Sequence, residues 1–153
     1  MIHVPRIPAT IEAVEERMRD SPIQRWVDPR VILVTDREVR FEVTAHDGWF
    51  NSHPEGLVHG GLLATLLDMA ATYSLVGTVG TPCPTIDLQI HYLEPALPGT
   101  LVAVGRQIRS GGRVSVAESE VHGPDGKRVA IARGTFVTVT VDDPPVPAPA
   151  PGR

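Results

Sequence analysis

The chain has 153 residues, of which 42% are hydrophobic and 21% charged, and its net charge is −4. This balance is typical of one soluble globular domain and excludes a disordered chain and the broad basic surface of a nucleic-acid-binding protein. The single cysteine excludes an internal disulfide framework and a multi-thiolate zinc site. The longest apolar run, residues 62–76, contains Asp68 and is short for a membrane span, and we expect no signal peptide. We therefore expect a cytoplasmic protein without membrane or nucleic-acid partners.

The first third of the chain predicts one short helix, two strands and a loop. The helix is expected over residues 10–19, because Thr10 can cap its start and Glu12 and Glu15 favour the positive end of the helix dipole. Strands are expected over residues 31–35 and 38–45, the second with a clean alternation of apolar and polar residues. Residues 46–58, rich in Asn, His, Pro and Gly, predict a loop.

The remainder predicts one central helix and four strands. The most apolar segment, residues 59–79, predicts the helix, and strands are expected over residues 85–93, 100–109, 113–122 and 128–141. Short turns rich in Pro and Gly connect the strands, which favours an antiparallel meander. The fold class is therefore α+β, with a single domain over residues 1–141 and a Pro/Ala-rich tail, residues 142–153, that we expect to be disordered. The helix is apolar nearly all round, so we expect a partner subunit to cover what one sheet cannot.

Asp68 is the one formally charged residue between Glu55 and Asp87, in the middle of the apolar helix. Thr65 stands three residues before it and Thr72 four after, so the three share one narrow face. Charged residues avoid such a position unless they are paired or used. Either the carboxylate is functional, or neighbouring hydroxyls or an arginine across an interface satisfy it, and composition alone leaves both interpretations open.

His59, Gly60 and Gly61 open the predicted helix. Two glycines let backbone N–H groups approach a ligand, and the helix dipole favours a developing negative charge there. The alternative is simply a tight entry from loop to helix. Asp68 lies nine residues beyond His59, about 13 Å along the axis, so the two can act on one atom only across a two-fold interface.

Other polar residues give weaker signals. His53 and His59 share a loop, but no third metal ligand stands at a recognisable spacing, and we expect no metal site. Cys83 has no base beside it, which predicts a packed or solvent-facing thiol. Arginines surround the turn at residues 110–112, either as a solvated face or as a phosphate-binding cluster: Arg106, Arg109 and Arg113.

The chain resembles the hotdog-fold acyl-CoA thioesterases of the PaaI-like (phenylacetic-acid-pathway) group in three segments: GLVHGGLLATLLDMA, PTIDLQIHYLEPALPGTL and GRVSVAESEVHGPDGKRVAIARGTFVTV. The likeness spans residues 48–141. It implies a long helix wrapped by a curved antiparallel sheet of five to six strands, in homodimers that often pair into homotetramers. The spacing from HGG to Asp68, combined with the TIDLQIHYLEPA strand, is far more specific for this family than either part alone.

The resemblance also implies roles for individual residues. Asp68 takes the position of the catalytic carboxylate, which activates water or attacks the thioester itself. Gly60 matches the glycine whose N–H polarises the thioester carbonyl, and His59 matches the histidine that helps to hold this loop and the carbonyl. Thr72 matches a helix hydroxyl that lies near the hydrolytic water in some relatives. Thr85 falls near a strand hydroxyl that plays a similar role in other relatives.

Two further positions belong to this comparison. Many relatives carry Asn or Gln six residues before the HGG histidine, where it helps to position water or the carbonyl. This chain has His53 there, which can still donate a hydrogen bond, so either catalysis uses His53 in that role or the activity differs in rate or pH profile. Arg109 and Arg113 are candidates for the coenzyme A phosphates, and Gly61 and Thr65 for further substrate contacts.

These observations predict a homo-oligomeric enzyme that hydrolyses an acyl-CoA to the free acid and coenzyme A. Asp68 would act as general base or nucleophile and the Gly60 N–H as oxyanion donor, at a subunit interface and with no cofactor apart from the coenzyme A of the substrate. The alternative is a non-catalytic acyl- or acyl-CoA-binding module. A hotdog dehydratase would need a different placement of Asp and His. The acyl group, a carrier-protein thioester and the choice between dimer and tetramer stay open.

Overall fold

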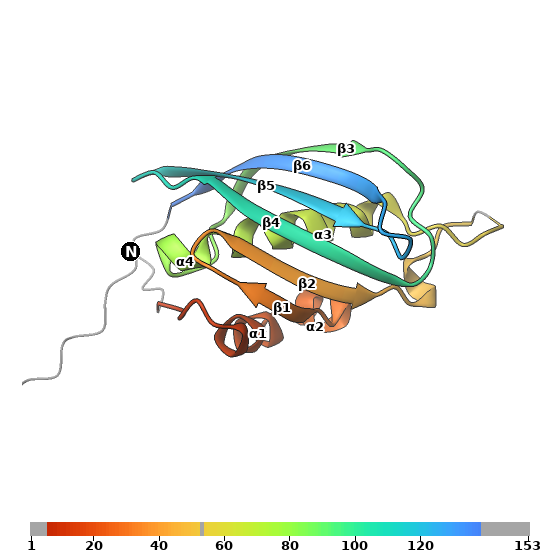
Figure 1. Cartoon of the computed structure of the whole chain (residues 1–153), viewed down its shortest axis with the longest axis horizontal. Helices are drawn as coiled ribbons and strands as arrows, with labels where there is room; N and C mark the ends of the chain where they lie inside the picture. The colour runs from red at the N-terminus through yellow and green to blue at the C-terminus, as the bar shows by residue number, and fades with distance from the viewer. Residues whose placement is uncertain (1–5, 53, 139–153) are drawn as a thin grey trace, which may run out of the picture.

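The computed structural model describes residues 6–52 and 54–138. Two short helices come first, followed by a hairpin, the central helical segment and four strands (Figure 1). In chain order the elements are α1 (Ile11–Asp20), α2 (Pro22–Val27), β1 (Arg30–Val34), β2 (Glu38–Thr44), the 3-10 turn η1 (Asp47–Trp49), α3 (Gly60–Tyr73), α4 (Val76–Val79), β3 (Thr85–Tyr92), β4 (Thr100–Arg109), β5 (Val114–His122) and β6 (Arg128–Val137).

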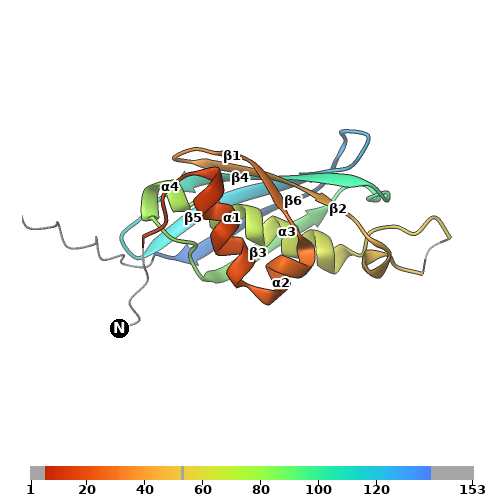
Figure 2. The same cartoon turned by 90° about the horizontal axis from the view of Figure 1, so that it is seen from below.

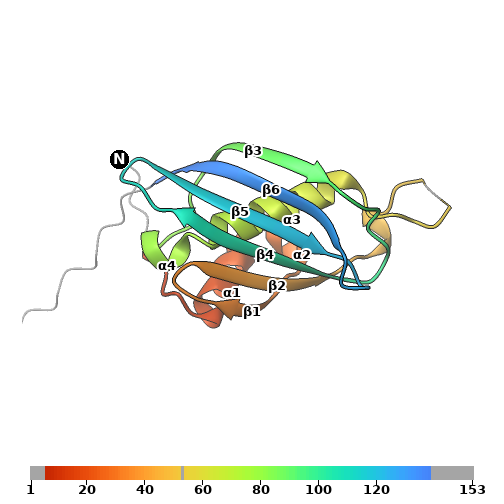
Figure 3. The same cartoon turned by 45° about the horizontal axis from the view of Figure 1, so that its top comes forward.

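All six strands form one antiparallel sheet in the order β1-β2-β4-β5-β6-β3. The sheet curves over α3, which runs behind the strands in Figure 3. The inward-facing residues of the sheet and the buried face of α3 make the main hydrophobic core. The predicted α+β class and the helix wrapped by a curved sheet are therefore confirmed.

The predicted meander is wrong at β3. This strand pairs with β6 and not with β4, its successor in the chain, so it forms one edge of the sheet. The seven residues 93–99 connect positions three strand spacings apart, roughly 14 Å, which an extended segment of that length spans easily. Turn composition predicts that the chain bends, but it does not say which strand becomes the neighbour.

Helix α1 follows the predicted signals closely. The Thr10 hydroxyl accepts a hydrogen bond from the Ala13 N–H, and Val14 and Met18 face the core. Helix α2 is an addition to the prediction, which expected only one helix before the first strand. Proline at the first position of a helix lacks an N–H that would be unpaired anyway, so the same residue ends α1 and begins α2.

The central helix is shorter than predicted. It ends at Tyr73, where the Ser74 hydroxyl donates to the Ala71 carbonyl, and the separate turn α4 ends at Gly80 with φ 85°. The segment Gly60–Val79 is long and apolar enough for a membrane span by composition alone, but 61% of its most apolar window is buried inside this fold. Its apolar character is therefore that of a core helix.

Helices α1 and α2 lie beside α3 near the β1 edge of the sheet (Figure 2). A hydrogen bond of 2.8 Å from the Tyr73 hydroxyl to Gln24 Oε1 joins the end of α3 to α2. Burial raises the pKa of Tyr73 to about 12, although the positive charge of Arg17 acts in the opposite direction.

Candidate active site

The start of α3 is anchored on both sides by backbone hydrogen bonds. The His59 N–H donates to the Trp49 carbonyl at 2.8 Å, and the Val58 N–H donates to the Ala96 carbonyl at 2.9 Å. Phe50 and Val58 form an isolated antiparallel bridge at the base of the loop. The helix therefore begins at a defined place, at the end of the molecule from which the loop before α3 projects (Figure 1).

His59 caps α3 with its side chain. Its Nδ1 accepts a hydrogen bond of 2.9 Å from the Gly61 N–H, which requires a neutral ring with its proton on Nε2. Its carbonyl accepts from the N–H groups of Leu62 and Leu63. The Gly60 N–H is different, since it donates to no acceptor among residues 6–52 and 54–138. One backbone donor at the positive end of the helix is thus left for an incoming oxygen.

Tyr92 covers this helix start from β3. Its hydroxyl donates a hydrogen bond of 2.9 Å to the Gly60 carbonyl, and a Cβ added at Gly60 would lie 3.3 Å from the Tyr92 ring. Sequence reasoning missed Tyr92 as a site residue. The available signal was a hydroxyl on the face of residues 85–93 that otherwise carries Ile86, Leu88 and Ile90.

Asp68 is half-buried in the second half of α3. Its Oδ1 accepts a hydrogen bond of 2.6 Å from the Thr85 hydroxyl, at the start of β3. No lysine or arginine of the described residues forms an ion pair with Asp68, and its Oδ2 has no hydrogen-bond donor there. The structure thus brings Asp68 and Thr85 together, and it leaves one carboxylate oxygen available to a water or a substrate.

Thr65 and Thr72, which share a face of the helix with Asp68, do not bond to it. The Thr65 hydroxyl donates to the Gly61 carbonyl at 3.0 Å, one turn back on the same helix. Thr72 is half-buried one turn beyond Asp68, and within the described part of the chain its side chain makes no hydrogen bond. Shared position on a helix face therefore did not predict the actual partner, which comes from β3.

The remaining candidates lie elsewhere or outside the described residues. Arg109 and Arg113 flank the β4–β5 turn, at the end of the molecule opposite the start of α3 (Figure 1), and both are exposed. Cys83 is buried, with its thiol 3.7 Å from the Thr81 carbonyl, so the packed alternative is observed. His53 falls outside the described residues. Within residues 6–52 and 54–138, no three His, Cys, Asp or Glu side chains form a group that could hold a metal ion.

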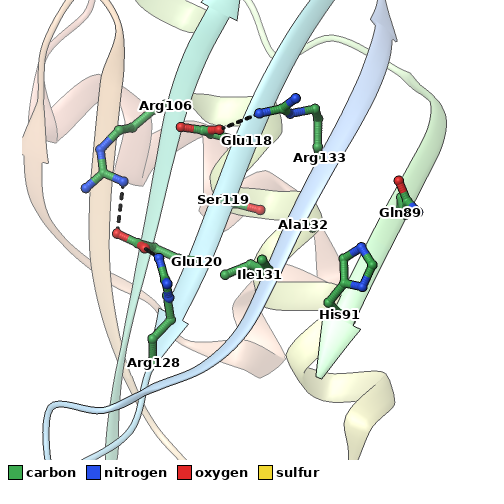
Figure 4. A pocket seen from close by; sticks show the side chains of 10 residues that line it. All are labelled: Gln89, His91, Arg106, Glu118, Ser119, Glu120, Arg128, Ile131, Ala132 and Arg133. Carbon is green, nitrogen blue, oxygen red and sulfur yellow. Dashed lines mark hydrogen bonds and ion pairs between the residues drawn. The ribbon is translucent and has the colours of Figure 1, made fainter. Parts of the chain in front are cut away.

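A depression of about 350 Å³ lies on the sheet face away from α3 (Figure 4). Its charged side chains pair with one another, as Arg106 does with Glu120 at 2.9 Å and Arg133 with Glu118 at 3.2 Å. Burial opposes the ionisation of Glu120, but hydrogen bonds from Arg106, Arg128 and His122 outweigh it and hold the pKa of Glu120 below its ordinary value. This surface is a network of ion pairs, separated from Asp68 by the sheet.

Comparison with known proteins gives consistent matches. Residues 55–130 match the family model of the thioesterase superfamily. A Halobacterium salinarum protein named "Putative esterase VNG_1336C" is 36% identical over 134 residues. The match covers 74% of this chain and 88% of that protein. The medium/long-chain acyl-CoA thioesterase YigI of Salmonella typhimurium is 30% identical over 110 residues, covering 58% of this chain and 71% of YigI.

Solved structures agree with these matches. An X-ray structure of a thioesterase-superfamily protein superimposes with a TM-score of 0.80 at 31% identity, covering 83% of this chain and 96% of that one. The PaaI protein of the Escherichia coli phenylacetic acid degradation operon shares the fold, with a TM-score of 0.71 at 22% identity over 82% of this chain and 93% of PaaI. The predicted PaaI-like resemblance is confirmed: the chain is a hotdog-fold member of the thioesterase superfamily, and this membership supports thioester hydrolysis as its general activity.

Proposed function

We propose that this protein hydrolyses an acyl-CoA thioester at two equivalent sites, each built across a dimer interface from Asp68 of one copy and the Gly60 N–H of the other. The named activity of YigI supports medium- and long-chain acyl-CoA as the first substrates to test. The two groups cannot meet within one copy. They are eight residues apart on one continuous helix, which corresponds to about 12 Å along the axis.

The observation that carries the proposal is the way β3 connects the two groups. At its first residue Thr85 bonds to Asp68, and at its last residue Tyr92 bonds to Gly60. Pairing β3 with a second copy in antiparallel fashion places the Thr85 end of one strand beside the Tyr92 end of the other. Asp68 of each copy thereby approaches Gly60 of the other.

The exposure of β3 supports this pairing. The strand is the free edge of the sheet beyond β6, and it presents unpaired backbone groups and large apolar side chains. Ile86 and Tyr92 are each 54% exposed, and Leu93 and Leu97 in the following loop are 46% and 44% exposed. A natural protein covers such an edge, and a second copy covers it with a matching one.

In the proposed reaction, the thioester carbonyl oxygen accepts a hydrogen bond from the Gly60 N–H. This bond stabilises the negative charge of the tetrahedral intermediate. Asp68 either removes a proton from the attacking water or attacks the carbonyl carbon itself. The C–S bond then breaks, and the thiolate of coenzyme A leaves and takes up a proton. In the general-base route this step releases the acid directly, whereas in the nucleophilic route water must first hydrolyse the acyl–Asp68 anhydride, which frees the acid and restores the carboxylate. Thr85 fixes the orientation of the carboxylate in either route.

The decisive measurement is release of free thiol from short-, medium-, long-chain and aromatic acyl-CoAs. We expect turnover by the wild type and a loss of at least about a hundredfold in Asp68→Ala, because a positioned carboxylate contributes that much. The variant should stay folded, since Ala suits the interior of a helix. Glu118→Ala, which removes an exposed carboxylate from the other sheet face, is the control and should keep full turnover.

Each other result has a definite meaning. Equal turnover by wild type and Asp68→Ala would contradict the assignment of Asp68. Saturable acyl-CoA binding without thiol release from any substrate would favour the non-catalytic binding module. Hydration of an enoyl thioester in place of hydrolysis would identify a dehydratase.

A further inference from the structure

Thr85 and Asp87 lie on opposite faces of β3, although residues two apart in a regular strand share a face. The Thr85 hydroxyl reaches Asp68 on α3, so Thr85 faces the helix. Asp87 bonds to the Thr135 hydroxyl of β6 and alternates with Gln89 and His91, which line the depression on the outer face (Figure 4). A regular strand would place Thr85 on that outer face, away from Asp68.

A β-bulge produces this change of face. Thr85 is opposite Phe136 and Asp87 is opposite Thr135, so β3 advances two residues while β6 advances one. Because of the extra residue, Ile86, the side chain before it, Thr85, points to the opposite face of the sheet from the one it would have in a regular strand. Bulges are common beside active sites for this reason, because they redirect one side chain without moving the sheet.

Two features of the neighbouring strand fit this bulge. The Thr135 hydroxyl donates to Asp87 Oδ2, which ties the first residue after the bulge to its partner on β6. Next to it, Gly134 leaves room for the bulged backbone: a Cβ there would lie 2.6 Å from the Asp87 carbonyl oxygen and 2.8 Å from Leu88 Cδ1. A glycine within a strand is typical of such a close approach.

We propose that Asp87 is a positioning residue of the thioesterase site: its bond to Thr135 holds the register of the bulge, and the bulge presents the Thr85 hydroxyl to Asp68. The inference rests on the proposed function, since it assigns a role within that site. Asp87 acts through Thr85 and touches neither substrate nor Asp68. Loss of the Asp87–Thr135 bond therefore lowers kcat and leaves KM unchanged.

A double-mutant cycle tests this indirect action. Thr85→Val should lower kcat about tenfold, the effect of one hydrogen bond to a charged group. Asp87→Ala and Thr135→Val, which each remove one half of the bond, should lower kcat about three- to tenfold, whereas Asp87→Asn keeps an acceptor oxygen and should restore most of it. In the Thr85→Val background, Asp87→Ala should have no further effect, because the contact through which it acts is already gone.

A matched control removes a different cross-strand bond from the same face. Glu118→Ala removes the exposed pair with Arg133 on β5 and β6, away from the bulge, and should leave kcat unchanged. An unchanged kcat in folded Asp87→Ala would overturn the proposal. Equal losses from Asp87→Ala with and without Thr85 would overturn it as well, because Asp87 would then act by another route.

Nuclear Overhauser contacts between Thr85 and Phe136 measure the bulge register without any substrate. They should be present in the wild type and Asp87→Asn and weakened in Asp87→Ala and Thr135→Val. Contacts of full strength in Asp87→Ala would contradict the proposal even if activity fell. If the wild type hydrolyses no thioester, the proposed function fails, and these contacts alone decide whether Asp87 holds Thr85 in place.

Discussion

At the scale of single residues, the site depends on which polar groups are already occupied. His59 uses its side chain and its carbonyl to pair three N–H groups of the first turn of α3, and this leaves the N–H of Gly60. Thr85 occupies one oxygen of Asp68 and leaves the other. The groups assigned to the proposed site are therefore those that the folded chain does not use for itself, which is the condition for binding an oxyanion and a water.

Replacing Gly60 by proline tests the oxyanion donor directly. Proline removes the N–H but suits the first position of a helix, and His59, with φ −63° and ψ 134°, already has the conformation favoured before proline. We expect kcat to fall about a hundredfold or more in acyl-CoA hydrolysis, as for other lost oxyanion donors.

The control for this experiment is Gly60→Ala, which adds a Cβ against the same Tyr92 ring but keeps the N–H. It should retain most of the turnover. Equal losses in the two variants would assign the effect to crowding of Tyr92 and would remove the Gly60 N–H from the mechanism.

At the scale of elements, α3 and the sheet approach each other through glycine. A Cβ added at Gly105 of β4 would lie 1.9 Å from the Ala70 carbonyl oxygen, so the helix backbone rests directly on the strand. This close contact sets the depth at which Asp68 and the start of α3 lie beneath β3. The placement of the site therefore depends on a position that carries no side chain.

Gly105→Ala should consequently lower the free energy of unfolding by about 3 kcal/mol, because neither backbone can yield as a flexible side chain would. Gly112→Ala, in the β4–β5 turn with nothing within 4 Å of the added Cβ, should change it by less than about 0.5 kcal/mol. Urea denaturation of the two variants measures the difference. Similar stability in both would mean that α3 moves away from the sheet at little cost.

The link between α2 and α3 predicts a loss of stability at high pH. Burial raises the pKa of Tyr73 to about 12, whereas an unfolded chain releases this proton near pH 10. Its contribution is complete below pH 10 and is lost as the pH rises toward 12, because the unfolded state then binds fewer protons than the folded state.

Urea denaturation at pH 8, 10 and 11 checks this sign. The free energy of unfolding of the wild type should decrease between pH 10 and 11. Tyr73→Phe, which lacks the ionisable hydroxyl and its bond to Gln24, should be less stable at pH 8 by about 1 kcal/mol and should decline less above pH 10. A parallel decline in both proteins would contradict a role for Tyr73.

At the scale of the whole molecule, a single copy holds both halves of the proposed site but cannot bring them together. The edge strand β3 carries Thr85 near Asp68 and Tyr92 near Gly60, and its apolar side chains are exposed. In the proposed dimer, a two-fold axis beside this strand would complete two sites at once. Activity and assembly should therefore be inseparable.

Mixing two inactive variants tests this arrangement. Asp68→Ala and Gly60→Pro, co-expressed in equal amounts, form mixed dimers in which one site carries both substitutions and the other carries none. Random pairing predicts recovery of about a quarter of wild-type turnover. Absence of recovery in dimers shown to be mixed would place both groups of a site in one copy and would contradict the interface proposal.

The sequence by itself determined the parts of this protein that depend on local periodicity and capping. Residues 10–19 predicted α1 almost to the residue, because Thr10 is a side-chain cap, and the alternation of residues 85–93 predicted β3. Asp68 and the His59–Gly61 start of α3 were also readable, since a lone carboxylate and a glycine pair stand out in an apolar helix.

Only the tertiary structure decided which of these groups meet. The pairing of β3 with β6, the bulge that turns Thr85 toward Asp68 and the Tyr92 bond to Gly60 all join residues distant in the sequence. Periodicity describes one strand or helix at a time, whereas neighbours and register follow from how all elements pack at once. For that reason Thr65 and Thr72, correctly placed on the face of Asp68, did not become its partners, and a strand residue did.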